Sequence, residues 1–397
     1  MIKIKIIIGV RLNDILHSQK ADRQFLSLGL GLRMQVVGCA SGVSYVVDVD
    51  GKLWYSGDSV YFPNNKDKKF KVISQDKLFS SVSHRYTHTL ALDIDQNVWG
   101  WGGFMEGELG AVPRGTRIVP LASPFPGLPP IKFILAGYNN SFFIDNEGCP
   151  WSCGYNHHGE LGINSKELRI SSPTKICAAN FPEITAIAAA QYQTLFLDHE
   201  GSVWSCGKNE KGDLGLGDCL ARSEPTKISN LPPIRSIFAG CYHSLFLDYD
   251  GNVWMCGNNQ ECSLLPDTIC STPMKIANIP PMKTVSLTNS RSMFIDERGD
   301  LWGVGDNSNF ALGLAEPKKY DSLSKVENIP PMVMVCTSFH SLFADENQSL
   351  WGCGKNQSGE LGMNHTKVAV PQLIPDAPSV PFPGRRGMNA KNARKIV

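Results

Sequence analysis

Residues 239–257 read AGCYHSLFLDYDGNVWMCG, and this stretch decides the fold. Its segment SLFLD is a short apolar run of the kind that forms a strand, and it ends in Asp248. The residues that follow close with Gly251, which is typical of a tight turn at positive φ. A second run, VWMCG, then carries Trp254. The stretch therefore predicts a β-hairpin whose second strand holds one tryptophan.

The same hairpin recurs along the chain. Seven tryptophans stand 45 to 53 residues apart, each after an apolar run that ends in aspartate: Trp54, Trp99, Trp151, Trp204, Trp254, Trp302 and Trp351. A glycine-rich element follows the hairpin, and it reads GKNEKGDLG at 207–215 and GKNQSGELG at 354–362. Segments such as SEPTKI and then LPPI complete the unit. Each unit thus holds about four short strands in roughly 50 residues, as a β-propeller blade does.

One such sheet cannot cover both of its faces, whereas seven arranged radially can. We therefore predict an all-β, seven-bladed β-propeller at residues 34–377. A lead segment at 1–33, which can pack on the ring, precedes it, and a basic, disordered tail at 378–397 follows it. Because the first unit starts inside its blade, we expect the N- and C-terminal segments to pair in one blade and close the ring.

Three propeller repeats have about this length, and the residues around the tryptophan separate them. A WD repeat needs aspartate after the tryptophan, but Gly, Ser, Tyr or Met follows it here. A kelch repeat needs a recurring Gly-Gly pair, which only Gly102-Gly103 supplies. The frame at 239–257, continued by the one at 198–215, resembles the regulator of chromosome condensation repeat. The resemblance covers about residues 34–375 in seven units.

The resemblance implies two classes of function. One is a protein-protein interaction propeller, a scaffold or regulatory module that recruits a partner protein. The other is a guanine-nucleotide exchange factor for a Ran-like small GTPase, which would act by binding the nucleotide-free GTPase best. The name-giving type inserts a wedge from one blade into the GTPase, but no unit here is enlarged. We therefore favour the interaction module and keep exchange as the alternative; an adaptor for ubiquitination or a nucleosome binder stays open.

The candidate partner-binding residues come from two kinds of loop. One position, just before a Ser or Thr, is His in three blades and is Ser44, Asn140, Gln193 or Arg291 in the others. Its side chain either braces the turn or contacts a partner, and the resemblance implies that this loop contributes to a GTPase-binding face. The rim loop at 111–120 adds two arginines. The candidates are His88, Asn140, His243, Arg291, His340, Arg114 and Arg117.

The C-terminal segment 380–397 differs from the rest because it is basic and contains no acid. Such a tail can bind nucleic acid or chromatin, an anionic membrane or an import receptor, or it can serve only as a solubilising tail. Its basic residues are Arg385, Arg386, Lys391, Arg394 and Lys395.

Other recurring residues have structural explanations. The seven tryptophans are expected in the core between blades. Cys153, Cys206, Cys256 and Cys353 occupy the same position in four units, so we expect buried core residues rather than a disulfide set. The chain contains no C-x-x-C pair, and the turn at 48–51 lacks the further ligands of a calcium loop. We therefore expect no metal, no cofactor and no covalent catalytic residue.

Composition bounds the remaining questions. The chain has 397 residues, 12 cysteines and a formal net charge of +1. Most of it therefore lacks the excess of positive charge that would attract nucleic acid. The apolar stretch at 6–10 is too short for a membrane span and lacks a clear cleavage site. We expect a monomer without a transmembrane segment, in the reducing cytoplasm or nucleus.

Overall fold

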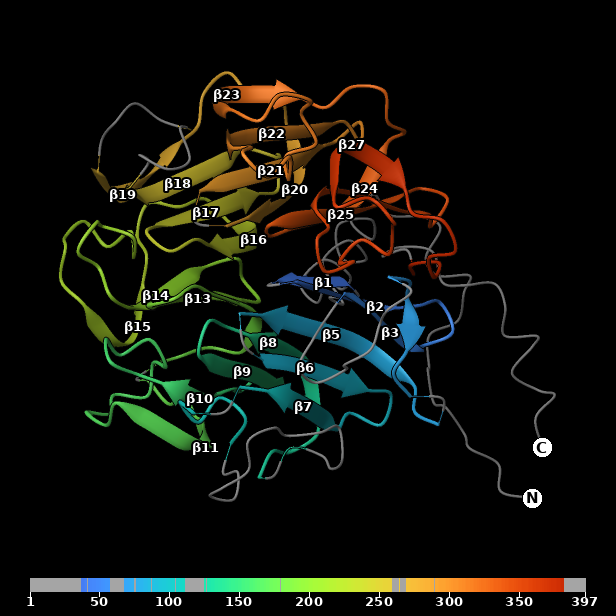
Figure 1. The fold of residues 1–397 in the computed structure, drawn as a ribbon. Coiled ribbons are helices and arrows are strands. Elements are labelled where there is room, and N and C mark those ends of the chain that lie inside the picture. The colour runs from blue at the N-terminus through green and yellow to red at the C-terminus, as the bar shows by residue number, and fades with distance from the viewer. Residues whose placement is uncertain are drawn as a thin grey trace, which may run out of the picture.

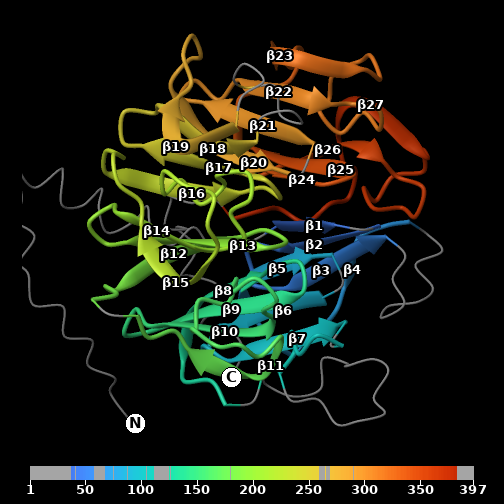
Figure 2. The same cartoon turned by 90° about the vertical axis from the view of Figure 1, so that its left-hand side faces the viewer.

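The computed structural model is an all-β, seven-bladed propeller, as predicted (Figure 1, Figure 2). It describes residues 37–381, apart from 41, 58–67, 75, 87, 104, 111–124, 126, 179, 259–263, 265–268 and 289. Every regular element in these ranges is a β-strand, and the strands form six four-stranded sheets and one three-stranded sheet. We number the sheets as blades 1 to 7 in chain order.

The strands follow one another along the chain within each blade. Blade 1 contains β1 (Val37–Ala40), β2 (Val43–Val47), β3 (Leu53–Gly57) and β4 (Lys71–Val72). Blade 2 contains β5 (Phe79–Arg85), β6 (His88–Asp93) and β7 (Val98–Gly102). Blade 3 contains β8 (Ile131–Ala136), β9 (Asn140–Asp145), β10 (Pro150–Tyr155) and β11 (Arg169–Lys175). Blade 4 contains β12 (Ile184–Ala189), β13 (Gln193–Asp198), β14 (Val203–Gly207) and β15 (Arg222–Lys227).

The remaining blades repeat this plan. Blade 5 contains β16 (Ile234–Ala239), β17 (His243–Asp248), β18 (Val253–Asn258) and β19 (Ile269–Lys275). Blade 6 contains β20 (Met282–Leu287), β21 (Arg291–Asp296), β22 (Leu301–Asp306) and β23 (Lys319–Lys325). Blade 7 contains β24 (Met332–Thr337), β25 (His340–Asp345), β26 (Leu350–Lys355) and β27 (Lys367–Leu373). The first strands of neighbouring blades contact one another all around the ring, so they are the innermost strands.

The core consists of layers between blades, because the two faces of each sheet carry different side chains. Between blades 4 and 5, Leu195 and Leu197 of blade 4 meet Phe246 of blade 5. Between blades 5 and 6, Leu245 and Leu247 meet Phe294 in the same way. One face therefore presents the aliphatic residues of the apolar run and the other presents its phenylalanine. Each blade covers the face that its neighbour cannot cover alone.

The tryptophans lie in these layers, but only one of the seven is fully buried. Trp99 is 5% exposed, whereas the other six are half-buried and pack at the edges of the interblade clusters. The fully buried aromatic side chain of blade 4 is Phe196, which pairs in register with Trp204 and is 0% exposed. The indoles thus lie in the interblade layers as expected, but the central aromatic residue in five blades is the phenylalanine of the second strand.

The ring closes by packing rather than by a shared sheet. The expectation that N- and C-terminal segments pair in one blade is not confirmed, since each sheet of the described chain contains strands that are consecutive in sequence. The reason is that β1 is already an innermost strand, so blade 1 completes itself before β5 begins. The innermost strands β1 and β24 lie side by side, and the amide of Val49 donates to the carbonyl of Ser379 at 3.1 Å. One hydrophobic cluster spans this junction.

The described strands run from Val37 to Leu373. The lead segment at 1–33 and most of the basic tail lie outside the described residues. A search of the described residues finds no helix long and apolar enough to span a membrane. The domain boundaries therefore remain predictions from the sequence.

Candidate partner-binding face

In each of the six four-stranded blades, two connections between strands lie on the same side of the ring. One joins the first and second strands, and the other joins the third and fourth. They touch in every blade from 3 to 7; the amide of Lys208 donates to the carbonyl of Tyr192 at 2.8 Å, and that of Asn258 donates to Tyr242 at 2.7 Å. We call this side the loop face. The opposite side, formed by the turns between second and third strands, is the hairpin face.

The glycine-rich element predicted at 207–215 begins the loop between β14 and β15, and it contacts the next blade. The hydroxyl of Ser244 in blade 5 donates to the carbonyl of Asp213 at 2.8 Å, and the thiol of Cys256 reaches the same carbonyl at 3.4 Å. Gly212 has a φ of +73°, and a Cβ there would lie 2.6 Å from Cα of Ser271. Only glycine fits both the backbone conformation and the close approach. The loop therefore fixes the spacing between blades.

The four cysteines predicted to be core residues are buried with free thiols, as expected. Each lies against a backbone carbonyl of the preceding blade's glycine-rich loop. Burial raises the pKa of all four thiols. They are therefore protonated packing residues rather than nucleophiles.

The acidic residue of the glycine-rich loop is buried instead of facing a partner. The amide of His158 donates to Oε2 of Glu160 at 2.7 Å, and the amide of Lys211 donates to Oδ1 of Asp213 at 3.1 Å. Burial raises the pKa of Glu160 to about 7 and that of Asp213 to about 6. These carboxyl groups hold the loop together from within.

The predicted histidine position lies between blades. Nε2 of His88 is 2.9 Å from the hydroxyl of Ser141 in the next blade, and Nε2 of His340 is 2.8 Å from that of Ser44 across the ring junction. Burial lowers the pKa of His88 and His340 to about 3 and that of His243 to about 4, so the rings are neutral. The histidine side chain therefore forms a bracing hydrogen bond, but its partner is a serine in the neighbouring blade and not a group in its own turn.

The non-histidine residues at this position are also inside. Arg291 donates to the carbonyl of Ser338 at 2.5 Å and pairs with Asp306 at 2.7 Å. Asn140 is 1% exposed. All five inner candidates, His88, Asn140, His243, Arg291 and His340, are thus at most 3% exposed. They can influence a partner only through the loops that they hold.

The strand register corrects one assignment at this position. Val43 pairs with Gly57 as His243 pairs with Gly257, so Val43 is the residue equivalent to His243. Ser44 is instead equivalent to Ser244, and its hydroxyl meets the histidine of the preceding blade. The apolar runs of blade 1 and blade 5 align one residue differently from our sequence comparison.

Several aromatic side chains reach solvent on the loop face, and sequence analysis missed them. The turn between the first two strands holds an aromatic residue in five blades: Tyr86, Tyr138, Tyr192, Tyr242 and Phe339. Tyr86 is 44% exposed, Tyr242 40% and Phe339 51%. The available signal was an aromatic residue one or two positions before the histidine position in several units.

Cations accompany these rings. Nζ of Lys208 lies 5.4 Å from the ring centroid of Tyr192, and Nζ of Lys355 lies 5.9 Å from that of Phe339. Tyr86 stacks on Tyr138 at 4.0 Å and has a φ of +53°, which is rare for a bulky residue. The arrangement offers flat apolar contacts beside positive charge, which suits a protein surface.

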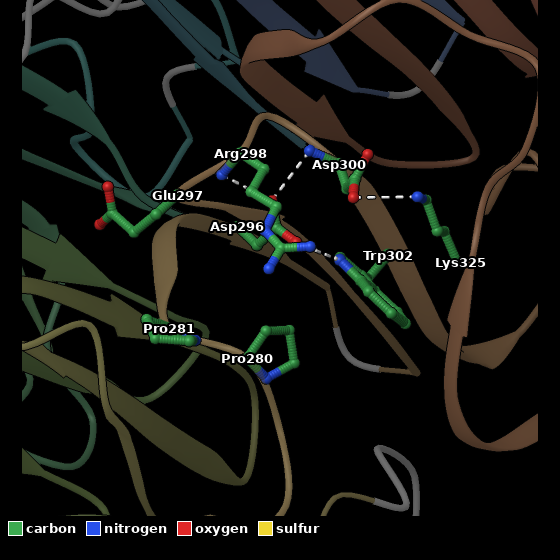
Figure 3. Close-up of a pocket in the computed structure, with 8 residues that line it drawn as sticks. All are labelled: Pro280, Pro281, Asp296, Glu297, Arg298, Asp300, Trp302 and Lys325. Carbon is green, nitrogen blue, oxygen red and sulfur yellow. Dashed lines mark hydrogen bonds and ion pairs between the residues drawn. The ribbon is translucent and has the colours of Figure 1, made fainter.

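The hairpin face has a different character. Figure 3 shows a pocket there, between the linker after blade 5 and the hairpin of blade 6. Lys325 pairs with Asp300 at 2.9 Å, and Asp296 accepts the indole N–H of Trp302 at 3.1 Å. Asp296 also accepts two backbone amides of its own hairpin, the hydrogen-bond pattern of the repeated turn, so these bonds explain its position. The pocket residues are Pro280, Pro281, Asp296, Glu297, Arg298, Asp300, Trp302 and Lys325.

One acidic turn on the hairpin face brings together Asp145, Glu147 and Cys149. Asp145 already accepts bonds from two backbone amides and from the indole of Trp151. The turn is therefore explained by its own hydrogen bonds. Arg114, Arg117 and the tail residues Arg385, Arg386, Lys391, Arg394 and Lys395 lie outside the described residues.

Comparison with known proteins agrees with the repeat frame. The family model of the regulator of chromosome condensation (RCC1) repeat matches residues 147–197 and 200–247, and a second model of the same description matches 234–261. The chain is 22% identical over 205 residues to the ultraviolet-B receptor UVR8 of Arabidopsis thaliana, covering 50% of this chain and 46% of the relative. It is 27% identical over 134 residues to the guanine nucleotide exchange factor SRM1 of Saccharomyces cerevisiae, covering 32% and 28%.

A third relative is the human protein named probable E3 ubiquitin-protein ligase HERC4, 27% identical over 151 residues, covering 38% of this chain and 14% of the relative. The chain thus spans less than half the length of these curated relatives. Among solved structures, yeast RCC1 (Prp20) bound to Kap60 superposes with a TM-score of 0.72 at 20% identity, over 94% of this chain and 90% of that one.

Human WBSCR16 superposes with a TM-score of 0.69 at 20% identity, over 77% of this chain and 85% of that one. At this identity the structural likeness concerns the fold. The seven observed blades and the repeat matches together show that the chain is a seven-bladed β-propeller that carries regulator of chromosome condensation (RCC1) repeats within residues 147–261.

Proposed function

We propose that this propeller is a protein-protein interaction module that binds its partner through the loop face. The observation that carries the proposal is the set of exposed aromatic residues in the turns between first and second strands, which we call the inner turns. The most exposed of them are Tyr86, Tyr242 and Phe339. Large rigid aromatic side chains supply contact area at low cost in conformational entropy, and they dominate the energetics of many interfaces.

The hydrogen bonds that hold the turns carrying these aromatic residues favour recognition by a preformed surface. In blades 3 to 7, the turn between the first two strands is tied to the neighbouring connection of its blade by a backbone hydrogen bond, as between Lys355 and Phe339 at 3.2 Å. The buried cross-blade contacts of His88 and His340 hold the strand that follows the turn. A surface held in this way loses little freedom when a partner binds. The inner candidates therefore act as positioning residues in this proposal.

Guanine-nucleotide exchange on a Ran-like GTPase is the second candidate. Its specific support is the sequence similarity to the exchange factor SRM1 over 134 residues. The propeller would accelerate release by binding the nucleotide-free GTPase better than the loaded one, without a covalent step. Binding of chromatin or nucleic acid by the basic tail, a monomeric state, and location in the cytoplasm or nucleus belong to the same proposal.

Two measurements test these functions. In the first, partners are captured with the wild-type chain, purified, and titrated against single alanine variants at Tyr242 and Phe339. We expect at least a tenfold loss of affinity for one of them, as hot-spot residues show. Tyr249→Ala is the matched control, since Tyr249 is 56% exposed on the hairpin face. Equal losses from the two faces would contradict the proposal.

In the second measurement, release of a fluorescent guanine nucleotide is followed from purified Ran and from a panel of other small GTPases. Exchange predicts release well above background, and a loss of that acceleration in folded His243→Ala or His340→Ala protein. Unaccelerated release from every GTPase, with a partner bound at the loop face, would leave the interaction module as the function.

A further inference from the structure

We propose that Cys39 and Cys336 form a reversible disulfide bond that locks the ring where blade 1 meets blade 7, with a small disulfide such as oxidised glutathione as the oxidant. The proposal concerns the stability of the ring and does not depend on the partner-binding function.

The geometry brings the two thiols together. Sγ of Cys39 lies 2.7 Å from Sγ of Cys336, although the residues are 297 positions apart in the chain. Both are free cysteines, on the neighbouring innermost strands β1 and β24. A disulfide bond of about 2.05 Å therefore needs only a small movement of two side chains. The cysteines of the repeat position, such as Cys256, contact backbone carbonyls instead.

The place of this pair in the ring gives the bond a consequence. Blades 1 and 7 share no strand among the described residues, and side-chain contacts such as Ser44 with His340 join them. The hydroxyl of Ser56 also donates to the carbonyl of Gly359 at 2.7 Å. A covalent bond here would close a loop that includes nearly the whole propeller. It would restrict the unfolded chain strongly, because the entropic effect grows with loop length.

The surroundings also assign the order of attack. The contact with Cys39, helped by the charge of Arg85, lowers the pKa of Cys336, whereas burial raises the pKa of Cys39. Cys336 is half-buried, and Cys39 is 6% exposed. Cys336 is therefore the thiol that meets a small disulfide first.

The reaction is two successive thiol–disulfide exchanges. The Cys336 thiolate attacks one sulfur of oxidised glutathione, forms a mixed disulfide and releases one glutathione thiolate, which takes up a proton. Cys39 then loses its proton and attacks Sγ of Cys336, forming the Cys39–Cys336 bond and releasing the second glutathione. Two protein thiols are oxidised and one glutathione disulfide is reduced to two thiols. Excess reduced glutathione reverses both steps.

The test equilibrates the full chain in glutathione buffers of increasing oxidised fraction, quenches with an alkylating agent, and maps the peptides by mass spectrometry. We expect a linked Cys39–Cys336 peptide and a rise in melting temperature of about 5 °C that dithiothreitol reverses. The rise should vanish in Cys39→Ser and in Cys336→Ser and persist in Cys219→Ser, which removes an exposed thiol.

Two results would overturn the proposal. One is glutathione attached to exposed cysteines such as Cys219 with no linked Cys39–Cys336 peptide under the most oxidising buffer. The other is a linked peptide without any change in melting temperature. A Cys336→Ala variant guards against misfolding of the serine variants, since alanine leaves no buried hydroxyl.

Discussion

Trp99 donates its indole N–H to Oδ2 of Asp93, six residues earlier, at 2.8 Å. The same bond occurs in all seven blades, with lengths from 2.6 to 3.2 Å. The other oxygen of the aspartate accepts the amides two and four residues later, as Asp198 does from Glu200 and Ser202. One carboxylate thus fixes both the hairpin turn and the orientation of the indole.

Replacing this carboxylate should destabilise the fold. Asp198→Ala removes the acceptor of two backbone amides and of the Trp204 indole, so we expect a loss of about 2–3 kcal/mol in the free energy of unfolding. Asp198→Asn keeps one carbonyl oxygen for the turn and should lose about half as much. Urea denaturation measures both. Equal losses in the two variants would show that the turn does not depend on that oxygen.

The core of each interblade layer should depend more on phenylalanine than on tryptophan. We expect Phe196→Ala to cost about 4 kcal/mol and Trp204→Ala about 3 kcal/mol, because Phe196 is fully buried and Trp204 is half-buried. Chemical denaturation of the two variants ranks them. A larger loss for Trp204→Ala than for Phe196→Ala would indicate that the indole is the central residue of the layer. An unchanged melting temperature of Trp204→Ala would show that Trp204 does not contribute to the core.

The glycine-rich loop should need glycine for lack of space as well as for its backbone conformation. Gly212 and Gly217 both have positive φ, +73° and +86°, but a Cβ at Gly217 meets nothing closer than 3.7 Å. Gly217→Ala should therefore cost only about 1 kcal/mol from its backbone conformation. Gly212→Ala should cost at least about twice that, because its Cβ would collide with backbone. Similar losses would mean that the loop shifts freely away from blade 5.

The buried carboxyl group of Glu160 should make stability fall as pH rises. Its pKa is raised by burial from 4.5 to about 7, so the folded protein binds a proton that the unfolded chain releases between these values. At 1.36 kcal/mol per unit, this group removes roughly 3 kcal/mol of stability between about pH 4.5 and 7. Glu160→Gln should lose that dependence.

Denaturation at pH 5 and pH 8 tests the sign. Relative to wild type, Glu160→Gln should gain stability at pH 8 compared with pH 5. A pH dependence unchanged by Glu160→Gln would mean that Glu160 is ionised at no cost in the folded state.

The sequence was sufficient for the fold because its signals are local and repeated. The apolar run, the Asp-to-Trp spacing and the glycine-rich element each follow from one blade, and seven copies leave little choice of architecture. Ring closure was harder to predict, because it depends on whether β1 is an innermost strand. The blade 1 alignment also slipped by one residue, since Val43 and Ser44 both fit an apolar run and only strand pairing separates them.

In the candidate site too, local features could be predicted from the sequence and contacts between blades could not. The histidine position was found in the sequence, but its cross-blade partner is 53 residues away for His88 and Ser141. No local pattern indicates that separation. The exposed tyrosines were overlooked because aromatic residues in a β-protein usually belong to the core. Only the positions of Tyr242 and Phe339 in turns that face solvent reveal them as surface residues.

Hydrogen–deuterium exchange of the chain with and without its purified partner tests the central claim most directly. The account predicts slowed exchange at the amides of the inner turns around Tyr242 and Phe339, with the hairpin turn around Tyr249 unchanged. Protection confined to the hairpin turns or to the outer strands would contradict it.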